Sequence, residues 1–279
     1  MHLRLLTTGG YTYRIVTLRP GTGIVFSANY FHQTWHIVTS QLGARMLARL
    51  LWAISFERHP GTLLLIHGGN LAPTPFEAER SDPFLIVPAG LTHLDSSAFR
   101  ILKGRLLRLG PPTKTIRWQT FGLDLALKQQ DSRPHSDGEH LYWKRNQHFW
   151  KQERMERIGG FICYSAPAAI LREQALMIHR LRVRKGHLTT EMDYHFLAYS
   201  SNKGSWYGDG EVQIFADYMD RVASANEARQ ELVANPKQPI LSETIQEVIS
   251  RRRDQIKARR RRRRRIVRGR QRRKESLVE

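Results

Sequence analysis

TSQLGARMLARLLWAISFERHPGTLLLIHGG, residues 39–69, is the stretch that predicts the fold class. Thr39 or Ser40 can cap a helix that runs to about Glu57, because a side-chain oxygen there accepts a hydrogen bond from the first turn. Apolar side chains at helical spacing give this helix one buried face: Leu42, Met46, Leu47, Leu50, Leu51 and Ile54. The apolar run 63–66 follows Gly61 and predicts a buried strand. An amphipathic helix followed closely by a buried strand indicates an α/β or mixed α+β domain.

The same alternation of strands and helices continues on both sides of this stretch. In the first half, strands are expected over 11–18, 23–27, 84–87 and 115–121, and a second helix over 96–109. In the second half, helices are expected over 139–158, 167–184 and 215–234, and strands over 161–164 and 187–199. The polar stretch 128–138 predicts a loop or boundary between an N-terminal part, 1–127, and a C-terminal part, 139–240, which can also form one domain together.

The composition supports a packed chain and excludes several classes of protein. Hydrophobic residues make up 41% of the 279 residues, which is enough for a core. The single cysteine, Cys163, excludes an intramolecular disulfide framework and a multi-cysteine zinc site. Arg45 and Arg49 interrupt the most apolar segment, 42–56, so no transmembrane segment is expected. Residues 1–18 lack the apolar stretch of a signal peptide, and an intracellular protein is therefore expected.

Positive charge is concentrated near the C-terminus. The chain carries 45 Lys+Arg against 25 Asp+Glu, a net charge of +20. Residues 251–274 hold 16 basic residues and one acid, Asp254, which leaves 29 basic and 24 acidic residues elsewhere, a net charge of +5. The sequence therefore describes a mildly basic globule followed by a strongly basic segment, 241–279.

The beginning of this basic segment has the pattern of a helix. Ser242 or Thr244 can cap it, and Thr244 with Glu247 forms a capping box. An apolar stripe within 241–256 can dock on the globule or on a protein partner: Leu241, Ile245, Val248, Ile249 and Ile256. The seven consecutive arginines 259–265 repel one another, so the helix is expected to run into a disordered Arg-rich tail.

The basic segment predicts binding to DNA or RNA. Arginine pairs bidentately with phosphate, and a polyanion that neutralised the run would release its condensed counterions. Phosphate contacts carry no sequence information, so binding is expected to be largely sequence-independent, in the cytoplasm or nucleoid, or in a nucleus. The expected contact residues are the basic ones: Arg251, Arg252, Arg253, Lys257, Arg259, Arg260, Arg261, Arg262, Arg263, Arg264, Arg265, Arg268, Arg270, Arg272, Arg273 and Lys274. A solvated tail, a nuclear-import address and attachment to an anionic membrane are the alternatives.

A cluster of acidic residues suggests a second class of function. On a strand, Glu191, Asp193 and His195 would share one face, and two carboxylates with an imidazole suit Mg²⁺. Downstream, Glu211 and Gln213 lie in a pattern that loosely resembles the metal-binding motif of restriction-type nucleases, although Gln213 stands where that motif usually has lysine. The alternative is a Mg²⁺-dependent nuclease or related phosphotransfer enzyme, with Glu191, Asp193, His195, Glu211 and Gln213 as catalytic residues and Glu191, Asp193 and Glu211 as metal ligands. If these residues form a polar strand face turned to water instead, no cofactor is expected.

The remaining motifs are incomplete. His32 and His36 could hold one metal ion on a helix, but the zinc-protease motif needs glutamate where Gln33 stands. The chain has no G-x-S-x-G, Walker A or G-x-G-x-x-G motif, which removes three enzyme classes. A third possibility is an assembly protein that packages nucleic acid with its basic segment. Nothing in these motifs separates DNA from RNA.

Overall fold

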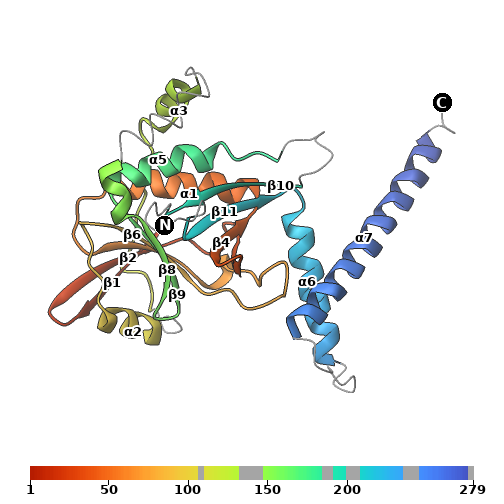
Figure 1. The fold of residues 1–279 in the computed structure, drawn as a ribbon, viewed down its shortest axis with the longest axis horizontal. Helices are drawn as coiled ribbons and strands as arrows, with labels where there is room; N and C mark the ends of the chain where they lie inside the picture. Colours follow the sequence, from red (N-terminus) through yellow and green to blue (C-terminus); the bar gives the residue numbers. More distant parts are fainter. Residues whose placement is uncertain (106–109, 132–146, 184–190, 199–207, 235–244, 276–279) are drawn as a thin grey trace. The chain divides into compact units, whose positions relative to one another are not determined.

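A computed structural model describes residues 1–105, 110–131, 147–183, 191–198, 208–234 and 245–275 (Figure 1). The chain divides into two compact units. The first comprises residues 1–72 and 82–216, and the second comprises residues 73–81 and 217–279. Each unit has its own buried core.

A seven-stranded mixed sheet organises the first unit. Its order is β7 (Lys114–Thr115), β1 (His2–Thr8), β2 (Tyr11–Thr17), β5 (Thr62–Ile66), β6 (Phe84–Pro88), β9 (Phe161–Ala166) and β8 (Arg154–Ile158). The pairs β2–β5 and β6–β9 are parallel, and the other pairs are antiparallel. Leu64 and Ile66 of β5 belong to one buried cluster and Leu63 and Leu65 to another, so both faces of the sheet are covered. This explains why the central strands are continuous apolar runs.

A four-stranded sheet lies in the same unit. Its order is β10 (Met192–Leu197), β11 (Gly210–Phe215), β4 (Thr34–Thr39) and β3 (Phe26–Phe31), with β11 parallel to β4 and the other pairs antiparallel. The β3–β4 hairpin turns through His32 and Gln33 alone, and both have positive φ, 49° and 63°. Two central residues with positive φ are the geometry of the two-residue hairpin loop whose twist matches that of the strands.

Two helices form the main cover of this unit. Helix α1 (Gln41–Ile54) begins as predicted, with the Ser40 hydroxyl accepting a hydrogen bond from the Gly43 backbone N at 3.2 Å. Helix α5 (Ala168–His179) packs side by side with α1, and together they contact β4, β10 and β11 (Figure 1). The shorter helix α2 (Ser96–Arg105) covers part of the seven-stranded sheet through Phe99 and Leu102. Helix α3 (Leu123–Asp131) and the 3₁₀ turns η1 (Gly68–Asn70) and η3 (Gln147–Gln152) complete the described elements.

The second unit is built from two helices and a short strap. Helices α6 (Tyr218–Ala234) and α7 (Ile245–Glu275) pack against each other and against residues 73–81. Their apolar contact is small and made of Ala78, Ala225, Ala228, Ile249 and Ile256. Arg253 is buried beside this cluster and donates a hydrogen bond to the Pro75 carbonyl at 2.8 Å.

The predicted fold class is confirmed: strands alternate with amphipathic helices, and a helix forms the C-terminal region. The expected strand 115–121 is reduced to the two residues of β7, and α3 was not foreseen. The expected helix 139–158 is wrong for its last part, because 154–158 is strand β8; residues 139–146 lie outside the described ranges. Gly159 and Gly160 both have positive φ and turn β8 directly back onto β9, which favours a hairpin over a helix.

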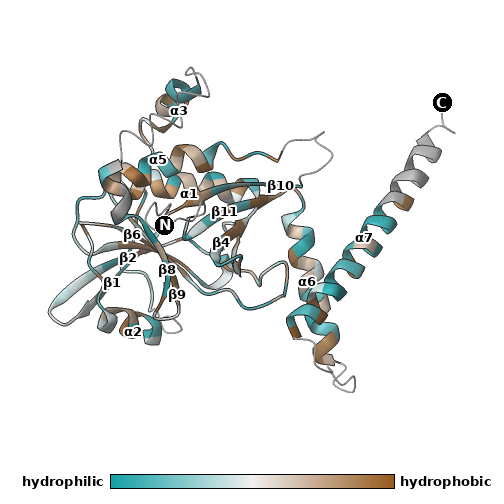
Figure 2. Cartoon of the chain, in the orientation of Figure 1, coloured by the Kyte–Doolittle hydropathy of each residue, from teal (hydrophilic) through white to brown (hydrophobic). Residues whose placement is uncertain are grey.

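Helix α7 extends further into the arginine run than like-charge repulsion predicted. It continues past Arg259 to Glu275 and is largely hydrophilic where Figure 2 colours it. None of the described helices is long and apolar enough to cross a membrane.

Candidate functional site

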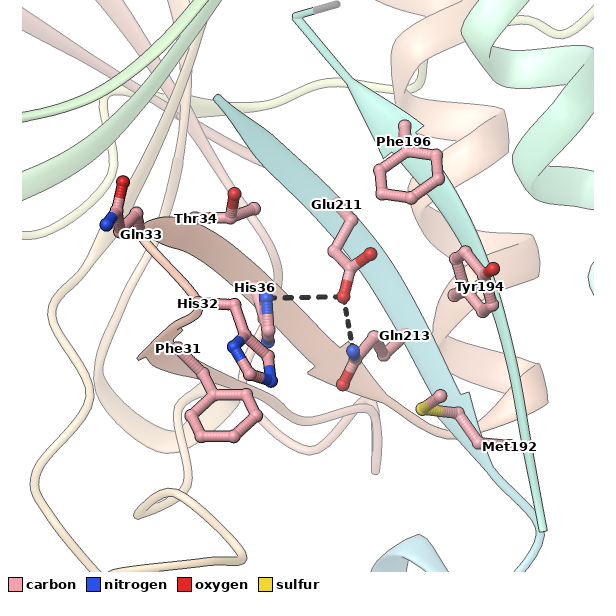
Figure 3. Close-up of a pocket in the computed structure, with 10 residues that line it drawn as sticks. All are labelled: Phe31, His32, Gln33, Thr34, His36, Met192, Tyr194, Phe196, Glu211 and Gln213. Atoms are coloured by element: carbon pink, nitrogen blue, oxygen red, sulfur yellow. Dashed lines mark hydrogen bonds and ion pairs between the residues drawn. The ribbon is translucent and has the colours of Figure 1, made fainter. Parts of the chain in front are cut away.

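A pocket of about 640 Å³ opens on one face of the four-stranded sheet (Figure 3). Strands β4, β10 and β11 and the β3–β4 turn supply its lining: Phe31, His32, Gln33, Thr34, His36, Met192, Tyr194, Phe196, Glu211 and Gln213. Helices α1 and α5 contact the same strands, and His195, which lies on the face opposite the pocket, bonds to α5. A pocket of this size falls within the range of small-molecule sites.

Three buried polar side chains form one side of the pocket. Glu211 lies in register with His36 on the neighbouring parallel strand, and its Oε1 is 3.2 Å from His36 Nε2. Gln213, two residues along β11 on the same face, donates from Nε2 to the same carboxylate oxygen. His36, Glu211 and Gln213 are each less than a tenth exposed. The sheet register therefore brings together residues that are 175 or more positions apart in the chain.

Burial controls the charge of this group. Desolvation, with a smaller contribution from His32, lowers the pKa of His36 to about 4. Desolvation also raises the pKa of Glu211, while the hydrogen bond from Gln213 and the nearby His32 oppose that rise. His36 is thus neutral at pH 7, and its Nε2 lies beside the Glu211 carboxyl group.

Strand β10, next to β11, gives the pocket an apolar and aromatic part. Tyr194 and Phe196 stand on the same face of β10, with ring centroids 5.3 Å apart in an edge-on arrangement, and Met192 continues this row. Phe31 at the end of β3 and Tyr194 are about half exposed, so aromatic surface stands at the mouth. The pocket combines a buried carboxylate with an aromatic wall.

The predicted catalytic cluster is divided between two faces of the sheet. In the antiparallel register Tyr194 faces Gln213 and Phe196 faces Glu211, so Asp193 and His195 lie on the other face. Glu191 lies just before β10, where its backbone carbonyl accepts a hydrogen bond from Ala216. Within the described ranges no three His, Cys, Asp or Glu side chains are placed to hold a metal ion. The sequence-based grouping required β10 and β11 to contribute the same face, and the observed register separates them.

The residues on the other face are held by structural hydrogen bonds. Asp193 accepts hydrogen bonds from the backbone N of Arg182 at 2.7 Å and of Tyr194 at 3.0 Å. His195 Nε2 lies 2.6 Å from the Oε1 of Gln174, and Gln174 Nε2 donates to buried Glu153 at 2.9 Å. Desolvation lowers the pKa of His195 to about 4 and raises the pKa of Glu153.

The depressed pKa of His195 predicts a pH-dependent stability. In the unfolded chain this histidine has an ordinary pKa of ~6.5, so between pH 6.5 and 4 the unfolded state binds more protons. When the pH falls from 7 to 5, the free energy of unfolding of the wild type is expected to decrease by about 2 kcal/mol more than that of a His195→Gln variant. Urea unfolding at the two pH values measures this difference. Equal losses in both proteins would show that His195 is not desolvated in the folded state.

The second candidate site is the basic helix α7. On the side that faces α6, its cations pair with acids: Arg252 with Glu231 at 2.5 Å, Lys257 with Asp217 at 2.6 Å, Arg260 with Glu227 at 2.6 Å, Arg261 with Asp217 at 3.2 Å, and Arg264 with Asp220 at 2.5 Å. Burial raises the pKa of Asp217, but hydrogen bonds from Lys257 and Arg221 outweigh it, so the pKa lies below its ordinary value. These acids offset the mutual repulsion of the arginines up to Arg264.

Three other arginines of α7 are exposed and weakly paired: Arg259, Arg262 and Arg263. Arg259 has one long contact with α6, to Glu231 at 3.8 Å, and no acid among the described residues pairs with Arg262 or Arg263. Of the predicted contact residues, Arg253 is turned inwards: it is buried, bonded to the Pro75 carbonyl and stacked 5.4 Å from the Phe76 ring. The side chains of Arg265, Arg268, Arg270, Arg272, Arg273 and Lys274 lie outside the described residues. We call Arg259, Arg262 and Arg263 the outer arginines.

The sequence did not single out the pocket residues as a group. It paired His32 with His36 on a helix, whereas the two belong to a hairpin, with His32 in the turn and His36 on β4. The available signal was the alternation of polar Thr34 and His36 with apolar Trp35 and Ile37, which on a strand places the two polar residues on one face. Comparison of the chain with protein-family models, curated proteins and solved structures finds no match.

Proposed function

We propose that this protein binds nucleic acid through the outer arginines of α7, by contacts to phosphate that are largely independent of sequence. The observation that carries the proposal is that α7 has more arginines than the acids of α6 hold in close pairs. Other cations of α7 pair closely with these acids, while Arg259, Arg262 and Arg263 are exposed on the helix. A folded helix presents these cations without the ordering cost that a flexible tail would pay.

The spacing of the outer arginines supports contacts to successive phosphates. Residues three or four apart on a helix are neighbours on its surface and are separated by about 5 Å along the axis. Guanidinium groups bind phosphate in a bidentate fork, and a row of them suits either DNA or RNA. Nothing in this arrangement reads base edges, so affinity without sequence preference is the expected behaviour.

The proposal is tested with the full-length chain and fluorescently labelled duplex and single-stranded DNA and RNA. Anisotropy titrations over a series of NaCl concentrations should show binding that weakens steeply, with a slope of log K against log salt of about −0.9 per duplex phosphate contacted. Several contacts would give a slope near −3 or steeper. Absence of a shift at low salt would refute the proposal.

Two further measurements on the same nucleic acids distinguish the proposal from its two alternatives. Parallel reactions with Mg²⁺ and with EDTA, analysed on denaturing gels, would reveal metal-dependent cleavage, the result expected of a nuclease. Light scattering with and without nucleic acid would reveal large assemblies, the result expected of a packaging protein. Intact substrate and a defined small complex are the results expected of a binding protein.

A further inference from the structure

The pocket on the four-stranded sheet has hydrogen-bonding groups that select for one kind of ligand. Gln213 donates one N–H to Glu211, which leaves its Oε1 and its second N–H for a ligand. Glu211 accepts that bond on Oε1, 3.2 Å from His36 Nε2, and its second oxygen, Oε2, has no bond from any described residue. Two acceptor oxygens, Glu211 Oε2 and Gln213 Oε1, are therefore available in the pocket and favour a ligand with N–H donors.

The aromatic residues of the lining add a requirement for the shape of the ligand. Phe31, Tyr194 and Phe196 present aromatic faces and edges, which favour a flat ring over a branched or strongly hydrated group. The acceptor oxygens of Glu211 and Gln213 favour N–H donors over the oxygens of a phosphate or carboxylate inside the pocket. An amino-bearing heteroaromatic ring fits these requirements, because it is flat, uncharged and has N–H donors.

The β3–β4 hairpin turn adds polar side chains to the pocket. His32 and Gln33, the two central residues of the turn, both belong to the lining, and Figure 3 shows His32 next to His36.

We propose that this pocket binds a nucleobase that carries an exocyclic amino group: cytosine, adenine or guanine. The amino group donates to Glu211 Oε2 and Gln213 Oε1, and the ring lies against Tyr194 and Phe196. Uracil and thymine have a carbonyl in place of the amino group, which would face these acceptors and be rejected. The choice of a base among such rings rests on the proposed function, because a nucleic-acid-binding protein meets bases at high local concentration.

Calorimetric titration of the full-length chain with cytidine, adenosine, guanosine and uridine tests this proposal. Cytidine is the matched partner of uridine because the two differ at the position that Glu211 and Gln213 would recognise. Cytidine is expected to bind at least 10-fold more tightly than uridine. Equal affinity for the two, or no binding of any of the four nucleosides at millimolar concentration, would overturn the proposal.

Two variants place the binding in the pocket. Glu211→Gln exchanges one acceptor oxygen for a donor and should weaken cytidine binding about 10-fold or more. Asp193→Asn removes a carboxylate from the other face of the adjacent strand and should leave it unchanged. Tyr194→Ala, at an exposed residue where folding is not in question, should weaken binding several-fold through lost stacking. Equal effects of Glu211→Gln and Asp193→Asn, or full affinity in Tyr194→Ala, would contradict the assignment.

The test keeps this proposal distinct from the function proposed for α7. Nucleosides carry no phosphate, so they report on the pocket and not on the outer arginines. Glu211→Gln should bind duplex DNA as the wild type does, since paired bases cannot enter a pocket. Methylguanidine, the head group of arginine, is also flat and has N–H donors, so it is titrated in parallel. Tight binding of methylguanidine without binding of any nucleoside would show a guanidinium site and overturn the proposal of a nucleobase site.

Discussion

Replacement of the outer arginines, in the triple variant Arg259→Gln, Arg262→Gln and Arg263→Gln, is expected to weaken duplex DNA binding on the order of 100-fold at about 0.1 M salt. Each lost phosphate contact removes the release of about 0.9 counterion, so the slope of log K against log salt should become shallower by about 2 to 3. These residues are exposed, and the only pairing with α6 lost among the described residues is the long 3.8 Å contact of Arg259 with Glu231, so the fold should be retained. Anisotropy titrations over a salt series measure both quantities.

The matched control removes the same charge from the first unit. Arg19, Arg58 and Arg100 are also exposed, and their replacement by glutamine changes the net charge of the chain by the same amount. This variant should bind duplex DNA within about two-fold of the wild type if a specific side of α7 is responsible. Equal losses in the two variants would mean that total charge, and not the outer arginines, determines the affinity.

The sequence located the basic segment but could not describe its structure. The pattern of 259–265, taken alone, predicts repulsion and disorder. The acids that offset this repulsion lie on α6, among them Asp220 and Glu227, more than 30 residues away in the sequence. Local pattern carries no information about which distant acids will face a helix. The same limitation hid the inward turn of Arg253, whose partner Pro75 lies 178 residues away.

The candidate pocket was unpredictable for a related reason. Alternation along one strand correctly indicated that Asp193 and His195 share a face, and that Tyr194 and Phe196 share the other. The register between two strands decides which residues of the neighbour join each face, and a shift of one residue would reverse it. The sequence contained no turn signal that fixed the register of β10 against β11. The grouping of Asp193 with Glu211 was thus a matter that only the folded chain could decide.

Elements with a strong local signal were the ones that the sequence predicted well. Helix α1 has a capping serine and an apolar stripe, and strands β5 and β9 are short apolar runs bounded by glycines or polar residues. In contrast, 154–158 has aromatic and basic neighbours that suggest a helix, and its strand form depends on pairing with β9. Pairing partners outweigh weak propensity in such segments.

Truncation of Phe26 to alanine is expected to cause the largest loss of stability, about 3–5 kcal/mol. Phe26 begins β3 of the four-stranded sheet and is fully buried, and its ring lies 6.5 Å from the ring of Phe84 on β6 of the seven-stranded sheet. Both rings belong to one buried cluster that also contains Leu47 and Ile54 of α1. Removal of the ring leaves a cavity at the point where the two sheets share their core, so both should be affected together.

Phe121→Ala is the matched control, because Phe121 is 81% exposed and the same atoms are removed. Its backbone carbonyl accepts a hydrogen bond from the Trp52 indole, and this contact survives the substitution. In chemical denaturation the free energy of unfolding of Phe121→Ala should stay within about 0.5 kcal/mol of the wild type. The midpoint of thermal unfolding of Phe26→Ala should fall by on the order of 10 °C. Similar small changes in both variants would mean that the two sheets do not share a core at Phe26.

Because β3 and β4 carry Phe31 and His36 to the pocket, a loosened core in Phe26→Ala should also weaken cytidine binding, whereas Phe121→Ala should leave it intact.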